Sequence, residues 1–273
     1  NDLRDKTIFI TGSSRGIGRE IALRCARDGA KVVITGKTVI PHAKLPGTIY
    51  TVADEVEQAG GRALAIQLDV RDELAIQAAV EQVAQHFGGI DVLVNNASAI
   101  SMTPTLETTP KRLDLMWDVN MRATFLVSQA CIPYLKRAAN PHILTLSPPL
   151  NLDAKWFAPH LAYTISKYGM SLCTLGLARE FAADGIAVDC LWPRTTIATA
   201  AIEFNFPEAV LHASRKPAIM ADAAHAILTR DSRTTGSGNF FIDEDVLRAA
   251  GESDFEQYAV SPGTQLFNDL FLG

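Results

Sequence analysis

The sequence is poor in the residues that build metal sites and disulfide frameworks. Its 273 residues include 4 Cys and 6 His, and neither type has metal-ligand or redox spacing such as His-Glu-x-x-His or Cys-x-x-Cys. We therefore expect no metal site. The four cysteines are widely spaced in apolar patterns, and we expect reduced, buried thiols at Cys25, Cys131, Cys173 and Cys190.

Positive charge and long apolar runs are also scarce. The 30 acidic residues outnumber the 25 Lys and Arg, the net charge is -5, and no long basic run occurs. Neither nucleic acid nor an anionic membrane is therefore an expected partner. No uncharged apolar run approaches the ~18 residues of a membrane span, and the amino terminus lacks a secretory pattern. We expect a cytoplasmic protein, and the start at Asn1 rather than Met leaves an organelle address open.

Alternating strand-like and helical patterns indicate the fold. Hydrophobic residues make up 48% of the sequence, enough for a substantial core. Buried strands separated by helices predict an α/β fold: a single doubly wound parallel sheet of the Rossmann type with helices on both faces. No linker or repeat divides residues 1–273, so we expect one domain with a C-terminal extension from about residue 243. The expected strands are residues 6–11, 31–35, 63–68, 91–95, 142–147, 186–192 and 239–242.

A glycine-rich loop follows the first expected strand and precedes a helix at residues 20–27. Strand, glycine loop and helix occur here in the order that a phosphate site requires. Glycines let the backbone approach a pyrophosphate, whose charge then faces the N–H groups at the helix start. By itself such a loop could also be an ordinary turn. We predict a dinucleotide site that includes Gly12, Ser14, Arg15, Gly16, Ile17 and Gly18.

A Tyr-x-x-x-Lys pair opens the helix expected at residues 163–182. This spacing places the phenol of Tyr163 and the ammonium of Lys167 on one helix face. A free tyrosine titrates near pH ~10, and a fixed cation nearby favours the phenolate and lowers its pKa. The pair is a candidate for proton transfer, although chance alone could supply it.

Three motifs in order resemble the short-chain dehydrogenase/reductase family over about residues 5–245. The family's Thr-Gly-x-x-x-Gly-x-Gly is matched from Thr11 to Gly18, its Asn-Asn-Ala at residues 95–97, and its Tyr-x-x-x-Lys at Tyr163 and Lys167. Residues 95–100, 147–152 and 258–263 are similar to one branch, whose longer members append a sterol-carrier domain. Together the motifs are far more specific than any one of them.

The resemblance implies hydride transfer between a nicotinamide cofactor and a carbonyl or alcohol substrate. Tyr163 would exchange the proton, and Lys167 would lower its pKa and bind the nicotinamide ribose. Asn120 would hold a water that links Lys167 to solvent, or would simply bond backbone at a helix kink. A homo-oligomer is implied in the same way. Further cofactor contacts are expected from Lys37, Asp69, Val70, Asn96, Ala97, Tyr163, Lys167, Pro193, Ile197 and Thr199.

The residues after the second strand favour NADP(H). An enzyme that prefers the unphosphorylated cofactor usually has an acidic residue there, but this sequence has Thr35-Gly36-Lys37. Lys37, helped by Arg15, would attract a 2′-phosphate, although both could be solvated surface charges. Asp69 is placed to accept a hydrogen bond from the adenine amino group, or to cap the next helix.

Three positions depart from the family pattern. The substrate-orienting serine is expected about a dozen residues before the tyrosine, whereas Ser147 lies further upstream, before two prolines. We assign the role to Ser147, with Asn151 as the alternative. Ser98 and Arg194 stand where the family has glycine. These changes put substrate geometry in question, so a non-catalytic cofactor- or lipid-binding module is the alternative function. Epimerisation or dehydration fits the chain length less well.

Apolar side chains dominate the segments expected near the substrate. They suit an apolar carbonyl such as a lipid or acyl chain, and a role in lipid metabolism, although ordinary packing would also explain them. We expect the segment at residues 255–272 to pack across the substrate mouth or a neighbouring subunit, and residues 38–48 to cover the adenine end or form a surface insertion. The pocket candidates are Met102, Trp156, Phe157, Trp192, Phe204 and Phe206.

Overall fold

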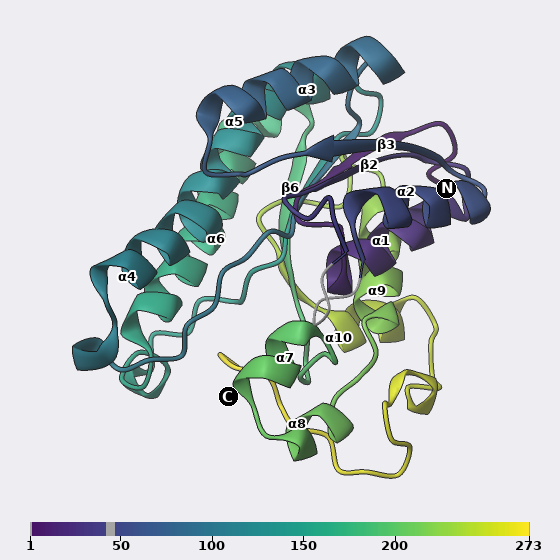
Figure 1. The fold of residues 1–273 in the computed structure, drawn as a ribbon. Coiled ribbons are helices and arrows are strands. Elements are labelled where there is room, and N and C mark those ends of the chain that lie inside the picture. Colours follow the sequence, from purple (N-terminus) through teal and green to yellow (C-terminus); the bar gives the residue numbers. More distant parts are fainter. Residues whose placement is uncertain (1, 42–46, 273) are drawn as a thin grey trace.

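The computed structural model describes residues 2–41 and 47–272. Seven strands form one parallel sheet in the order β3-β2-β1-β4-β5-β6-β7 (Figure 1). The predicted doubly wound parallel sheet is confirmed. The strands are β1 (Thr7–Ile10), β2 (Lys31–Gly36), β3 (Arg62–Gln67), β4 (Val92–Asn95), β5 (His142–Thr145), β6 (Ala187–Trp192) and β7 (Phe240–Ile242).

Helices cover both faces of the sheet because successive strand side chains point to opposite sides. In β1, Ile8 and Ile10 pack with α1, α2 and α9, whereas Phe9 packs with α3 and α5. The longer helices are α1 (Gly16–Ala26), α2 (Ile49–Gln58), α3 (Glu73–Phe87), α5 (Ala123–Leu135), α6 (Leu161–Glu180) and α9 (Ala218–Leu228). The shorter ones are α4 (Pro110–Met116), α7 (Ala200–Asn205), α8 (Glu208–His212) and α10 (Asp243–Ala249).

The chain crosses from one half of the sheet to the other between β3 and β4. Consequently β1 has β2 on one side and β4 on the other. In open α/β sheets, ligands bind outside the carboxyl ends of the strands at such a switch point. We therefore expect a ligand-binding site at the loops that follow β1 and β4.

A π-helical turn, η2 (Trp117–Arg122), lies between α4 and α5. Within η2, Met121 packs against α6 where a Cβ on Gly169 would lie 2.6 Å from the Met121 Cγ. Inserted π turns occur often at functional sites. Here the turn carries Asn120, which is fully buried.

All four cysteines are free thiols. Cys25, Cys131 and Cys190 are buried as expected, but the expectation is wrong for Cys173, which is partly exposed. Within residues 2–41 and 47–272, no helix combines the length and apolar character of a membrane span. The same residues contain no cluster of three or more His, Cys, Asp or Glu suited to a metal ion.

Candidate active site

The glycine loop turns tightly between β1 and α1. Gly12 and Gly16 have φ values of 66° and 58°, the left-handed region that glycine tolerates without strain. The loop also passes close to β4, since a Cβ on Gly18 would lie 2.5 Å from the Asn96 Nδ2. No larger side chain fits there, so the glycine at this position reflects the close approach of the Asn96 side chain to the start of α1.

The Thr-Gly and Asn-Asn-Ala motifs form one hydrogen-bonded unit. The Asn96 Nδ2 donates to the carbonyl oxygens of Thr11 and Gly12, both at 2.9 Å. The Thr11 Oγ1 accepts from the backbone N–H groups of Asn96 and Ala97, both at 3.0 Å. These bonds fix the loop over the carboxyl ends of β1 and β4.

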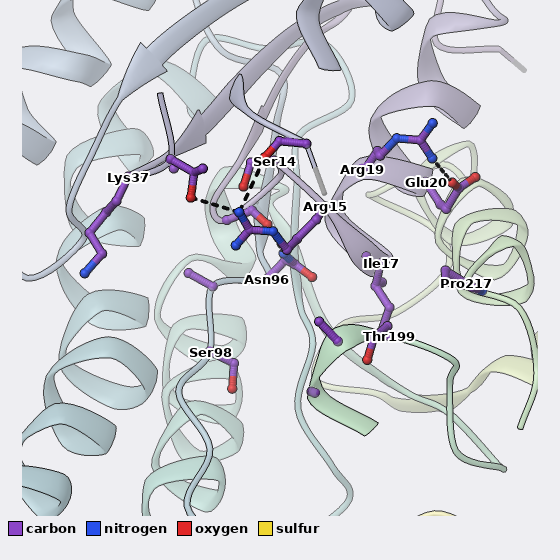
Figure 2. A pocket seen from close by; sticks show the side chains of 18 of the residues that line it. Ser14, Arg15, Ile17, Arg19, Glu20, Lys37, Asn96, Ser98, Thr199 and Pro217 are labelled. Carbon is purple, nitrogen blue, oxygen red and sulfur yellow. Dashed lines mark hydrogen bonds and ion pairs between the residues drawn. The ribbon is translucent and has the colours of Figure 1, made fainter. Parts of the chain in front are cut away.

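A cavity of about 820 Å³ opens above this unit (Figure 2). Its volume is in the range of cofactor pockets, and its glycine-lined floor exposes the start of α1, so the residues present fit a dinucleotide. Of the predicted cofactor residues, Gly18, Pro193, Ile197, Tyr163 and Lys167 are not in its lining. Those that do line it are Gly12, Ser14, Arg15, Gly16, Ile17, Lys37, Asp69, Val70, Asn96, Ala97 and Thr199.

The cavity wall also contains residues that the motifs did not mark. Ser98, which replaces a family glycine, lines the cavity, as does Thr38 after β2. Ile197 instead packs in the core, whereas the predicted Thr199 and its neighbour Ala198 line the cavity. Arg194 forms an ion pair with Asp245.

Basic side chains gather at the end of β2. The Arg15 Nη2 donates to the Thr38 Oγ1 at 2.9 Å and to the Gly47 carbonyl oxygen at 3.5 Å. Figure 2 shows Arg15 reaching over the cavity and Lys37 at its edge. Residues 42–46 of the expected excursion at 38–48 lie outside the described residues.

Asp69 is held by cations on the protein itself. The Lys37 Nζ lies 3.6 Å from Asp69, and Arg71 donates to both carboxylate oxygens. The Arg71 hydrogen bonds hold the pKa of Asp69 at about 2. Asp69 thus has cationic partners on the protein, and a hydrogen bond from the adenine amino group stays a prediction. The capping alternative is wrong because Asp72 caps α3, accepting from the Ala75 N–H at 3.0 Å.

The Tyr163 and Lys167 side chains lie buried on α6. The Lys167 Nζ donates to the Leu146 carbonyl oxygen at 2.7 Å and lies 5.2 Å from the centre of the Trp192 ring. Burial lowers the pKa of Lys167 to about 7, because the charged ammonium loses its hydration. The Lys167 ammonium is therefore fixed in place, and it titrates near neutral pH.

The expectation of a lowered tyrosine pKa is wrong for this structure. Burial raises the pKa of Tyr163, and the negative charge of Asp269 raises it further. Desolvation of the phenolate thus outweighs any help from Lys167 while the site is closed. No motif marks Asp269, which lies 106 residues beyond Tyr163 in the chain and reaches the site only through the fold.

Asn120 and Ser147 both have partners away from the phenol. The Asn120 Oδ1 accepts from the Ala99 N–H at 2.7 Å, and its Nδ2 donates to the Ala99 carbonyl and the Ser166 Oγ, both at 2.9 Å. The Ser147 Oγ lies 3.0 Å from the Cys190 Sγ. In the described part of the chain, no hydrogen bond joins Asn120 or Ser147 to the Tyr163 hydroxyl. Asn120 thus bonds to backbone from a distorted helical turn, which is the alternative that the sequence left open for it.

Aromatic side chains surround Tyr163. Phe271 lies against it with a ring separation of 6.4 Å, so the segment at residues 255–272 does pack onto the expected catalytic pair. Met102, Trp156, Phe157 and Trp192 belong to the same cluster. Phe204 does not, because it is half exposed on α7.

Comparisons with known proteins agree with this geometry. The short chain dehydrogenase family matches residues 6–207. Hydroxysteroid dehydrogenase-like protein 2 from Xenopus laevis is 57% identical over 266 residues, 97% of this chain, and the match spans only 63% of that relative's length.

Solved structures share the fold closely. A crystal structure from Xanthomonas campestris has a TM-score of 0.97 and 53% identity, with full coverage of both chains. A short chain dehydrogenase from Mycobacterium thermoresistibile has a TM-score of 0.94 and 50% identity, covering 100% of this chain and 96% of that one. The chain therefore belongs to the short-chain dehydrogenase family, whose members are oxidoreductases that use a nicotinamide cofactor.

Proposed function

We propose that this protein transfers a hydride between NADP(H) and the carbonyl or alcohol group of an apolar substrate, with Tyr163 as the proton donor or acceptor. The observation that carries the proposal is the buried Tyr163 and Lys167 pair on α6, in the same fold as a glycine-lined dinucleotide cavity. Neither feature alone is specific. Their combination matches the chemistry of a hydride-transfer site.

The side chains would divide the work as follows. Bound NADP(H) supplies or accepts the hydride. Tyr163 gives a proton to the developing alkoxide in reduction and takes it back in oxidation, a contribution worth about 10²–10⁴ in rate. Lys167, held by the Leu146 carbonyl, keeps a positive charge near the phenol and favours its anion when the substrate-bound site is formed. Ser147 is proposed to orient the substrate oxygen, which requires its hydroxyl to turn from Cys190.

The phosphorylated cofactor is favoured by charge at the end of β2. Arg15 and Lys37 line the cavity there, and the nearby Asp69 carboxylate is already balanced by Arg71 and Lys37. A 2′-phosphate would lie near the cations Arg15 and Lys37. The Asp69 carboxylate beside it already has its charge balanced by ion pairs. An unphosphorylated ribose would find no free carboxylate in this part of the lining.

An apolar substrate is supported by the cluster around Tyr163, which includes Met116, Tyr168 and Trp192. The name of the relatives, hydroxysteroid dehydrogenase-like protein 2, agrees with such a substrate. The match covers only part of those proteins. The proposed role in lipid metabolism therefore rests on the apolar residues of this chain itself.

The experiment that tests the function is Tyr163→Phe, assayed for turnover and for cofactor binding. We expect turnover to fall by at least about 10²-fold, because the proton donor is lost, while NADPH affinity is unchanged and NADPH binds more tightly than NADH. Tyr134→Phe on α5 is the matched control and keeps full activity. Turnover that survives in Tyr163→Phe would contradict the proposal.

A binding module without catalysis is the second candidate. It is favoured by the side chains of Asn120 and Ser147, which already have hydrogen-bond partners elsewhere. NADPH binding by the wild-type protein, with no turnover across a panel of ketones, aldehydes and alcohols, would support this candidate over the enzyme.

A further inference from the structure

The segment Phe267–Leu272, here called the strap, lies along the loop that follows β6. The Phe267 carbonyl accepts from the Thr196 N–H at 2.9 Å, and the Asp269 N–H donates to the Arg194 carbonyl at 3.0 Å. These bonds attach the strap in the antiparallel sense to residues 194–196. Its path is therefore set by main-chain pairing up to Asp269.

Beyond Asp269 the strap places the Phe271 ring against Tyr163, with Leu270 and Leu272 packed at the same cluster. Phe271 is 1% exposed, and its ring centre lies 5.3 Å from Tyr168, 5.9 Å from Trp192 and 6.4 Å from Tyr163. Trp156 and His160 complete the surroundings. The Phe271 ring thus fills an aromatic cage of which Tyr163 is one wall.

Packing holds Phe271 in that cage. The last hydrogen bond that anchors the strap runs from the Trp192 Nε1 to the Leu270 carbonyl oxygen, at 3.0 Å. Among residues 2–41 and 47–272, no main-chain hydrogen bond holds Phe271. Its φ of 71° is a left-handed conformation that is strained for a bulky side chain and that persists only where the surroundings enforce it. Leaving the cage would relieve this strain.

The groups that face the ring are suited to an uncharged guest. The Tyr168 hydroxyl donates to the Asn151 carbonyl at 2.6 Å and accepts from the Asn151 N–H at 3.1 Å, so its polar capacity is used. Met116 and Trp192 add apolar surface. Aromatic walls favour a flat or compact apolar group in edge or offset contact.

We propose that Phe271 is the specificity-determining residue of this site: its ring holds the place beside Tyr163 that the apolar part of the substrate takes, and the substrate enters by displacing it. The substrate is then a ketone or secondary alcohol whose reacting carbon carries an uncharged group about the size of a phenyl ring, aromatic or alicyclic. This inference rests on the proposed function and adds the substrate class to it.

The test compares acetophenone with acetone, which lacks the ring. Affinity is measured calorimetrically in the presence of NADP⁺, where no ketone can react, and kcat/KM is measured with NADPH. In Phe271→Ala, acetophenone no longer competes with the ring, so we expect affinity and kcat/KM for acetophenone to rise together by about tenfold or more. Values for acetone and the NADPH affinity stay unchanged.

Phe267→Ala is the matched control, because Phe267 lies on the same strap but is half exposed and outside the cage. It should leave the affinities and kcat/KM values for both ketones, and the NADPH affinity, as in the wild type. Phe271→Leu, which keeps an apolar side chain, gives a smaller shift in the same direction and serves if Phe271→Ala fails to fold.

Two results would overturn the inference: unchanged acetophenone affinity in both Phe271 variants, or, where the wild-type protein does reduce acetophenone, tighter binding with no gain in kcat/KM, which would place the ring outside the productive position. A different result would overturn the proposed function and not the place of Phe271. This is tighter acetophenone binding in Phe271→Ala while neither the wild-type protein nor the variant reduces either ketone.

Discussion

Asp269 brings a negative charge to the catalytic pair. Burial raises the pKa of its carboxyl to about 7, opposed by the Leu270 N–H; the charge of Asp243 on α10 raises it further and that of Lys167 lowers it. In return, Asp269 raises the pKa values of both Tyr163 and Lys167. The three groups titrate as a coupled set across the strap and α6.

Replacing Asp269 by asparagine is therefore expected to shift the pH dependence of the reaction. Without its charge, the pKa values of Tyr163 and Lys167 both fall. The Lys167 pKa of about 7 sets the limb of the pH profile of kcat near neutral pH, so this limb moves to lower pH in Asp269→Asn. Steady-state rates measured between pH 5 and pH 10 test this.

The matched control for that experiment is Asp254→Asn, an exposed carboxylate earlier in the same region of the chain. Its profile should overlay that of the wild type. A profile for Asp269→Asn that stays in place, or moves to higher pH, would show that the carboxylate does not act on the pair.

At the scale of elements, the sheet could be predicted because its strands are short apolar runs buried on both faces, as at Val92–Asn95. The glycine loop and the Asn-Asn-Ala motif could be placed because each follows such a strand, and the Tyr-x-x-x-Lys pair because its spacing fits one face of a helix. The π turn at Trp117–Arg122 could not, because it depends on contacts of Asn120 with Ala99 and Ser166, which lie 21 and 46 residues away.

The same reason limits prediction of the site. A close contact such as that of Gly18 with Asn96 can be predicted from the sequence, because only glycine fits there. Side-chain partners such as Cys190 for Ser147, or Arg71 for Asp69, leave none, because many residue types could stand there. The cofactor cavity was thus largely predictable, whereas the state of the catalytic pair was not.

A buried ion pair joins α10 to the loop beneath the strap. Arg215 and Glu244 are each less than 10% exposed and form a hydrogen-bonded pair. The Arg215 main chain also bonds to Thr196 and Ala198, at 2.9 and 2.8 Å. This pair therefore supports the loop that lines the cavity and carries the strap.

Removing the arginine should destabilise the fold strongly. Arg215→Met leaves Glu244 buried without its main partner, so we expect the free energy of unfolding to fall by about 3 kcal/mol in chemical denaturation. Arg248→Met, which removes an exposed partner of Glu244 at 3.4 Å, should cost less than about 1 kcal/mol. Equal losses in the two variants would contradict a special role for the buried pair.

At the scale of the whole molecule, one helical face is unusually apolar. Ile165, Leu172 and Leu175 lie exposed on α6, and Leu113 and Phe125 lie exposed on the neighbouring α4 and α5. These helices form one side of the molecule, opposite α1 and α2 (Figure 1). Exposed apolar residues gathered on adjoining helices mark an interaction surface.

The homo-oligomer implied by the family resemblance stays a prediction, and this face is where we expect two copies of the chain to meet. A C2 interface uses the same patch twice, so a helical face with its own apolar stripe can pair with itself. Stable interfaces bury about 1,200–2,000 Å² in total, and adjoining helices can supply such an area. The cofactor cavity stays open, since its lining comes mainly from the loops above the sheet.

Leu172→Glu tests this assembly, because Leu172 is 57% exposed near the middle of α6. Two copies of a carboxylate would be desolvated at the interface without partners, so we expect the dimer mass seen by light scattering to fall to that of the monomer. NADPH affinity should not change. Tyr50→Glu, at a similarly exposed position on α2 in the opposite helix layer, should leave the mass of the assembly as it is. A wild-type protein that is monomeric at micromolar concentration, or equal dissociation in both variants, would rule out this face as the interface.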